Sequence, residues 1–258
     1  MLPLRRRRLF RDFYFYEVKS MANPIRNLLD SVEQAVFGIN SARYAAYLRK
    51  RGATVGEGTK FYGKITIDLT RPSLVEIGRD CVFTDNVRLL THGFDWSVLR
   101  EKYGEVLASA AKVVIEDNVF IGMSTIILKG VRIGKDTIIG AGSVVTHDIP
   151  ANSVAAGNPC RVVMTIDEYY SKRKEEYIEE ARAYALELYQ KTGEVPRQED
   201  FWDEFPIFFE RNKKLPPRFR EQLGSSFENF LKAKPLYPSF EEFLVASGIP
   251  RSAIEREE

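Results

Sequence analysis

The sequence of 258 residues has few of the residue types that form cross-links or metal sites. It contains two cysteines, two histidines and two tryptophans. Cys81 and Cys160 are too few for the disulfide framework of a small secreted domain, which favours a reducing, cytoplasmic compartment. Two histidines cannot supply the three imidazoles of a three-histidine catalytic zinc site. We therefore expect neither structural disulfides nor a metal requirement.

The sequence also lacks a strong charge bias and long apolar runs. Its 38 basic and 36 acidic residues give a net charge of +2, which does not indicate a nucleic-acid-binding protein. No run of about 18 apolar residues is present to span a membrane. The first residues, MLPLRRRRLFRDFYFYEVKSM, place a basic block before an aromatic patch. This segment is interpreted as an extension to the folded protein, with weak membrane-surface contact as the alternative.

A six-residue repeat runs through the middle of the sequence, with interruptions at residues 69–76 and 93–114. With an apolar content of 44%, twelve apolar residues at every sixth position would arise by chance about once in 10^4 trials. The twelve residues are Val55, Phe61, Ile67, Ile77, Phe83, Leu89, Ile115, Ile121, Ile127, Ile133, Ile139 and Val145.

A period of six is typical of a short strand followed by a corner, with the apolar residue pointing inward. The residue four places later is small or β-branched and fills the corner, as in Thr59, Cys81, Val87, Thr125, Val131, Thr137 and Ser143. Three strands form a triangular coil of about eighteen residues, and stacked coils bury faces that one coil leaves open. The predicted fold is mainly β, a parallel β-helix.

The segment IGKDTIIGAGSVVTHDIPANSVAAGNPCRVV, residues 133–163, resembles the end of the hexapeptide-repeat acyltransferases. It is most similar to the galactoside, maltose and streptogramin O-acetyltransferases and to the surface-polysaccharide O-acetyltransferases. The resemblance covers residues 47–163. It implies a left-handed β-helix, acetyl-CoA as co-substrate and a homotrimer with sites between neighbouring chains.

The resemblance also implies a catalytic role for His92, which stands in RLLTHGFDWS just before a long loop. A neutral imidazole within hydrogen-bond reach of a sugar hydroxyl can take its proton as the oxygen attacks a thioester. Asp95, Asp85 or a backbone carbonyl is expected to orient this imidazole. Trp96 and Tyr103, with Asp85, are candidate acceptor-binding residues; the two aromatic residues could instead anchor the loop.

The resemblance places the donor along a second set of residues. Ala141 and Thr146 border the pantetheine arm, and Arg161 meets the phosphates with a guanidinium. His147 stands where related enzymes commonly have lysine, and Met123 where some have serine, so these contacts are altered. The full expected acetyl-CoA set is Gly122, Met123, Ala141, Gly142, Thr146, His147 and Arg161.

Helical segments are predicted on both sides of the β-helix. Residues 1–52 form the extension and a capping helix over 27–51, residues 53–163 form the β-helix with its loop 93–114, and residues 164–258 form a helical extension. Thr165 and Glu168 make a capping box that starts a helix ending near Gly193. SFENFLKA (226–233) and SFEEFLVA (239–246) predict two short capped helices.

Three other functions are alternatives to a saccharide O-acetyltransferase. An N-acetyltransferase of an amino-sugar nucleotide would use the same base. A γ-class carbonic anhydrase has the same fold but needs three histidines. A non-enzymatic β-helix scaffold leaves the position of His92 and the GAGSVVT and GNPCRV segments unexplained. The sequence therefore predicts acetyl transfer to a saccharide or nucleotide sugar with His92 as general base.

Overall fold

The computed structural model describes residues 41–211 and 214–255. The chain divides into two compact units, residues 1–169 and 170–258, so that the dividing point falls inside helix α5 (Ile166–Thr192). The predicted basic extension and the first part of the predicted capping helix fall outside the described residues. None of the described helices is long and apolar enough to cross a membrane.

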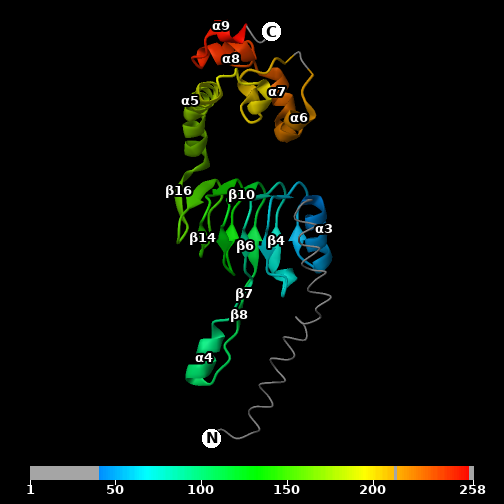
Figure 1. Ribbon diagram of the computed structural model, residues 1–258. Coiled ribbons are helices and arrows are strands. Elements are labelled where there is room, and N and C mark those ends of the chain that lie inside the picture. Colours follow the sequence, from blue (N-terminus) through cyan, green and yellow to red (C-terminus); the bar gives the residue numbers. More distant parts are fainter. Residues whose placement is uncertain (1–40, 212–213, 256–258) are drawn as a thin grey trace. The chain divides into compact units, whose positions relative to one another are not determined.

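The first unit is a coil of three parallel sheets (Figure 1). The first sheet contains β1 (Thr54–Val55), β4 (Val75–Ile77), β9 (Val113–Ile115) and β12 (Arg132–Ile133). The second contains β2 (Lys60–Phe61), β5 (Val82–Phe83), β10 (Val119–Ile121), β13 (Thr137–Ile139), β15 (Ser153–Ala156) and the antiparallel β16 (Arg161–Thr165). The third contains β3 (Thr66–Ile67), β6 (Arg88–Leu89), β11 (Ile126–Ile127) and β14 (Val144–Val145).

The prediction that the repeat residues point into the interior of the coil is confirmed for each of them. All twelve residues of the six-residue repeat are buried, with at most 7% of any of them exposed. All seven of the predicted corner residues are buried as well, and Thr125 and Ser143 satisfy their hydroxyls by donating to backbone carbonyls. The coil therefore keeps an apolar interior and places its few buried hydroxyls where the chain turns.

The sequence separation between hydrogen-bonded residues on successive turns shows where the two interruptions of the repeat lie. An uninterrupted turn takes 18 residues, which is the separation of Asn118 from its hydrogen-bond partner Asp136 on the next turn. The separation rises to 22 residues between Cys81 and its partner Thr59, because four extra residues leave the coil near the 3-10 helix η1 (Pro72–Leu74). It rises to 38 residues between the turns that contain β5 and β10, because a twenty-residue arm leaves between β6 and β9.

The arm is a narrow ribbon that ends in one helix. Strands β7 (His92–Gly93) and β8 (Ser109–Ala110) pair antiparallel and lead to α4 (Trp96–Tyr103), as Figure 1 shows. Every residue of α4 is at least partly exposed. Phe94, Val98 and Tyr103 are more than half exposed.

The β-helix is bounded by helices at the two ends of its sequence. Helix α3 (Ser41–Arg51) buries Tyr44 and Leu48 in the same core as Phe61. At the other end, the Thr165 hydroxyl accepts a hydrogen bond from the Glu168 N–H at 3.2 Å. The Glu168 carboxylate in turn accepts from the Thr165 N–H at 2.7 Å. This reciprocal capping box starts α5, which ends before Gly193 in a left-handed conformation.

The second unit is a small helical domain with a phenylalanine-rich core. Its elements after α5 are η2 (Gln198–Asp200), η3 (Phe205–Ile207), α6 (Pro217–Leu223), η4 (Gly224–Ser226), α7 (Phe227–Lys232), α8 (Phe240–Ala246) and α9 (Arg251–Ile254). Both predicted short helices are present, but their starts differ. Ser239 caps α8 by accepting from the Glu242 N–H at 3.2 Å, whereas Ser226 makes no such bond among the described residues because η4 runs directly into α7.

Candidate active site

His92 stands at the root of the arm, where the chain leaves the coil. Leu89, three residues earlier, is fixed in the wall between Ile67 and Ile127. The strand pairing of His92 with Ala110 then holds the first residues of the arm. About a third of the imidazole side chain is exposed (31%), so a substrate can reach it. The local structure thus combines a rigid support with access from solvent.

The carboxylate of Asp68 lies directly beside the imidazole. Its Oδ2 is 2.5 Å from His92 Nδ1 and also accepts hydrogen bonds from the N–H and hydroxyl of Thr91, at 3.1 and 2.6 Å. Its Oδ1 accepts from the N–H and hydroxyl of Thr70, at 3.1 and 2.7 Å. Only 8% of the Asp68 side chain is exposed, so this carboxylate is held in one orientation.

These contacts keep Asp68 ionised. Burial, the largest single influence, raises the pKa of its carboxyl. The hydrogen bonds from Thr91, Thr70 and His92 together outweigh burial and hold that pKa well below its usual range. An ionised Asp68 can only accept, so Nδ1 of His92 must carry the hydrogen between them. The lone pair of the imidazole is then on Nε2, for which no hydrogen bond is formed within the described residues.

The hydrogen bond that the sequence analysis assigned to Asp95, Asp85 or a carbonyl is made by Asp68. Asp85 lies at a different corner, where its Oδ1 accepts from the Lys64 N–H at 2.6 Å. Asp95 precedes α4, and its Oδ1 lies where a Cβ on Gly93 would collide with it. Neither carboxylate forms a hydrogen bond with His92 among the described residues.

The sequence does contain a signal for Asp68. Ile67 and Leu89 belong to the same stack of repeat positions, and the structure pairs them. The residue after Ile67 is therefore placed beside the residue after Leu89, close to the root of the arm. This proximity is hard to see in the sequence because Asp68 and His92 are 24 residues apart, a separation that includes the four-residue insertion after Asp68.

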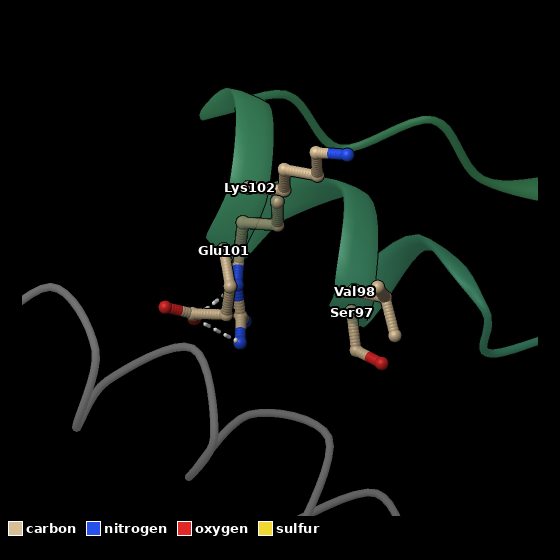
Figure 2. Close-up of a pocket in the computed structure, with 5 residues that line it drawn as sticks. Ser97, Val98, Glu101 and Lys102 are labelled. Carbon is tan, nitrogen blue, oxygen red and sulfur yellow. Dashed lines mark hydrogen bonds and ion pairs between the residues drawn. The ribbon is translucent and has the colours of Figure 1, made fainter.

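The predicted acceptor aromatics, Trp96 and Tyr103, are both on α4. Arg100 lies over the Trp96 ring at 5.4 Å and Lys102 over the Tyr103 ring at 5.0 Å. Tyr103 is 62% exposed, so it does not anchor the arm by burial within the described residues. Figure 2 shows a shallow depression on the same helix, lined by Ser97, Val98, Arg100, Glu101 and Lys102. His92 does not line this depression.

Four of the predicted donor-binding residues share one corner of the coil. Because Ile121 pairs with Ile139, Met123 and Ala141 follow at neighbouring positions on successive turns. The Gly142 N–H donates to the Met123 carbonyl at 2.7 Å. Gly142 has a φ of 70°, and a Cβ built there would meet nothing within 4 Å. This corner is therefore open to a ligand at Gly142, whereas Gly122 is buried against the next turn, where a Cβ would lie 2.5 Å from the Ala141 nitrogen.

Arg161 lies just beyond that corner. It pairs with Ala156 at the start of β16, and its guanidinium donates to the Cys160 carbonyl at 2.8 Å. The Cys160 N–H in turn donates to the Val144 carbonyl at 2.9 Å, which connects this turn to the third sheet. Arg161 is exposed and forms no ion pair among the described residues. Its remaining donors face solvent and can receive a phosphate.

Thr146 and His147 lie at a different corner from the other donor residues. The Thr146 hydroxyl is 2.8 Å from His147 Nδ1. Val145 pairs with Ile127, and Ile127 with Leu89, so this corner is the one from which the arm and His92 depart. The structure thus separates the predicted donor set into two rows. The outer face of the third sheet lies between them.

Comparison with known proteins assigns the family. Residues 112–147 match the family model described as bacterial transferase hexapeptide (six repeats). The galactoside O-acetyltransferase of Escherichia coli (strain K12) is 38% identical over 160 residues, 60% of this chain and 75% of that protein. The galactoside O-acetyltransferase of Lactococcus lactis subsp. lactis (strain IL1403) is 39% identical over 122 residues, 47% and 58% respectively. A solved maltose O-acetyltransferase from Clostridium difficile 630 is 32% identical, with a TM-score of 0.37, covering 49% of this chain and 76% of that chain.

The chain belongs to the hexapeptide-repeat acetyltransferases, and it is therefore an acyltransferase. The fold of this family is a left-handed parallel β-helix, to which the three parallel sheets of the first unit correspond.

Proposed function

We propose that the protein is an acetyl-CoA-dependent O-acetyltransferase acting on a saccharide, with His92 as general base and Asp68 as the residue that positions it. The observation that carries this proposal is the contact of Asp68 Oδ2 with His92 Nδ1. This contact fixes the imidazole beside the wall of the coil, and Nε2 has no hydrogen-bond partner among the described residues. A base must lie within hydrogen-bond reach of the proton it removes, and a fixed imidazole meets that requirement.

The reaction transfers the acetyl group directly. His92 Nε2 takes the hydroxyl proton of the acceptor while its oxygen attacks the thioester carbonyl carbon and forms the new C–O bond. The tetrahedral intermediate then collapses, the C–S bond breaks, and the thiolate of CoA receives the proton from the imidazolium. Asp68, held ionised by its hydrogen bonds, stabilises the positive charge that His92 carries between these steps.

Acetyl-CoA lies along the outer face of the third sheet in this proposal. The two rows of expected donor contacts border that face, with Met123 and Ala141 on one side and Thr146 on the other. The outward residues Ile126 and Val144 are only partly buried and offer apolar surface to the pantetheine. Arg161 binds a phosphate of the nucleotide end. The thioester is thereby directed toward the corner that carries His92.

The acceptor is a saccharide hydroxyl. The relatives named above include two galactoside O-acetyltransferases, which supports a sugar and supports oxygen over nitrogen as the acceptor atom. The arm that starts at His92 supplies Trp96 and Tyr103 as surfaces for a sugar ring. Both cysteines are free and buried, in keeping with a cytoplasmic reaction.

A homotrimer completes the site. Within one chain His92 is open to solvent on one side, and every residue of α4 is at least partly exposed. An eight-residue helix is marginal unless a face of it is packed. Neighbouring coils in a trimer supply that packing and enclose the donor.

The test is an acetyl-transfer assay with acetyl-CoA and a panel of sugars, sugar nucleotides and oligosaccharides, read by mass spectrometry. The expected product is a saccharide that has gained one acetyl group, released by mild base as an ester. An acetyl group that resists mild base would assign nitrogen as the acceptor. Absence of transfer to every saccharide, with binding of acetyl-CoA intact, would overturn the saccharide assignment.

A further inference from the structure

Two cations that have no carboxylate partner among the described residues flank His92. Arg88 is the exposed residue of β6, the strand from which the chain continues through Leu90 to His92. Its inward neighbour Leu89 is fully buried, so Arg88 points out from the third sheet. The described residues offer it no ion pair and no side-chain hydrogen bond.

Arg88 is close enough to serve the acceptor bound at His92. Residues 88 and 90 both face outward and are about 6.6 Å apart along the strand. Since Thr66 pairs with Arg88 and Ile67 with Leu89, the next residue, Asp68, lies beside Leu90. Asp68 in turn holds the imidazole. An arginine side chain is long enough to cover the distance from residue 88 to residue 90, and so to reach the position beside Asp68.

Lys129 approaches the same point from the next turn of the coil. Because Ile127 pairs with Leu89, Lys129 lies one turn, about 4.8 Å, from Thr91. Lys129 is half-buried, and it forms no ion pair with any described residue. The carboxylate of Asp148 at the next turn is engaged elsewhere, accepting from the Arg132 N–H at 2.7 Å.

Position on the turns next to His92, and not the lack of an ion pair, sets Arg88 and Lys129 apart, because Lys60 and Arg161 also form no ion pair with a described residue. Arg79 pairs with Asp117 at 2.8 Å, and ion pairs also join Lys112 to Glu76 and Arg132 to Glu116. The carboxylate at His92, Asp68, has its acceptor capacity directed to Thr70, Thr91 and the imidazole. The coil beside the imidazole thus contributes two cations, Arg88 and Lys129, next to the partly apolar surface of Ile126 and Val144, while the arm contributes the carboxylate of Asp95, whose Oδ1 lies against Gly93.

We propose that the acceptor is an acidic saccharide whose carboxylate or phosphate is bound by Arg88 and Lys129. The inference rests on the saccharide acetyltransferase activity proposed above and specifies its substrate class. Arg88 matches the planar, two-oxygen edge of a carboxylate or phosphate, and Lys129 adds a point charge from the adjacent turn. An anion there fixes the orientation of the sugar, and thus which hydroxyl reaches His92.

The test compares acceptors that differ at one carbon atom, which bears an anionic group in one member of each pair and a neutral hydroxyl in the other. The first pair is methyl glucoside against methyl glucuronide, and the second is glucose against glucose 1-phosphate, each assayed with the full chain at saturating acetyl-CoA. We expect at least one acidic acceptor to have the higher kcat/KM of its pair by about tenfold. Arg88→Gln should lower the acidic-to-neutral ratio about 10- to 100-fold, the effect of losing one charge-assisted hydrogen bond. Lys129→Gln should lower it by a smaller factor.

Lys60→Gln is the matched control, because Lys60 is a cation on the outer face of the second sheet, in β2. It should leave the acidic-to-neutral ratio of the wild type unchanged. KM for acetyl-CoA and for acetyl-dephospho-CoA is measured in parallel. If Arg88→Gln raises KM for acetyl-CoA but not for the dephospho form, Arg88 serves the donor phosphate and the inference is wrong.

The remaining outcomes separate this inference from the proposed function. A wild type that acetylates neutral and acidic members of both pairs equally overturns the acidic acceptor and leaves the acetyltransferase intact. A variant that lowers kcat/KM for both members by the same factor does likewise. A wild type that acetylates no saccharide overturns the proposed function, and the acidic acceptor with it.

Discussion

Replacing Asp68 by asparagine tests the proposed base most directly, because it removes a charge while keeping the shape of the side chain. Three donors converge on Oδ2, from Thr91 and His92. The asparagine oxygen should therefore take the Oδ2 position, with its amide nitrogen turned toward exposed Thr70. The His92 Nδ1 hydrogen bond then survives in neutral form, and the imidazole keeps its orientation.

The expected loss follows from the strength of that one hydrogen bond. A bond to a charged acceptor contributes about 1.5–3 kcal/mol and a neutral bond about 0.5–1.5 kcal/mol. The difference of about 1–2 kcal/mol weakens the stabilisation of the imidazolium and lowers kcat about 5- to 30-fold. Asp68→Ala should lower kcat further and also destabilise the fold, because the N–H and hydroxyl of fully buried Thr91 lose their acceptor, at about 1–3 kcal/mol each.

The pH dependence has a definite sign. Since the pKa of Asp68 is lower in the folded chain than in the unfolded one, ionised Asp68 stabilises the fold above about pH 4. This contribution is lost as the pH falls through the folded value, so urea unfolding of Asp68→Asn should depend less on pH in the acid range.

Initial rates, urea unfolding and the double variant Asp68→Asn/His92→Ala measure these effects. The double variant should be no slower than His92→Ala alone, because positioning has no value without the base. Asp117→Asn, which removes a carboxylate paired with Arg79 away from His92, is the control and should keep the wild-type kcat. Near-normal turnover in Asp68→Asn, or additive losses in the double variant, would refute the pairing as a catalytic device.

Three further predictions concern the base, the donor and the assembly. His92→Ala should keep the fold and acetyl-CoA binding while lowering kcat by about 10^2 to 10^4, whereas His147→Ala should be mild; the reverse order in a rate assay would reject His92. Arg161→Ala should weaken acetyl-CoA binding by about 1–3 kcal/mol in calorimetry and leave KM of the saccharide unchanged; unaltered binding would remove Arg161 from the site. Light scattering should give about three times the chain mass of 29.6 kDa. A stable and active monomer would contradict a shared site.

The coil was predictable from sequence because its interior repeats one environment. Each sixth residue packs against the equivalent residue of the neighbouring turn, as Ile121 does against Ile139. An apolar residue at any of these positions therefore predicts the same inward-facing strand position. The helix that starts at Thr165 was predictable for a related reason, since a capping box acts over three residues.

The contacts of the candidate site are not local, and for this reason the sequence did not indicate all of them. The resemblance to the hexapeptide-repeat acyltransferases singled out His92, because it stands just before a long loop. To identify its partner Asp68, the register between two turns of the coil must be known. That register depends on the length of the insertion after Asp68, which the apolar pattern defines only approximately. The division of the donor residues between two corners had the same cause. Met123 and Thr146 are separated by a short stretch of sequence, yet they border opposite sides of one sheet.

The position of the arm also bears on the order in which the coil assembles. Contacts between successive turns close a loop of 18 residues after the arm, as between Asn118 and Asp136, but of 38 residues across it, as between Arg79 and Asp117. Loop-closure entropy makes the longer closure less favourable by about 0.7 kcal/mol. Each turn of the coil forms against its neighbour. The contacts between the turns on either side of the arm should therefore be the slowest to form during folding and the first to open. His92 lies at this junction. Binding of donor and acceptor at His92 should therefore stabilise the contact between the turns before the arm and the turns after it.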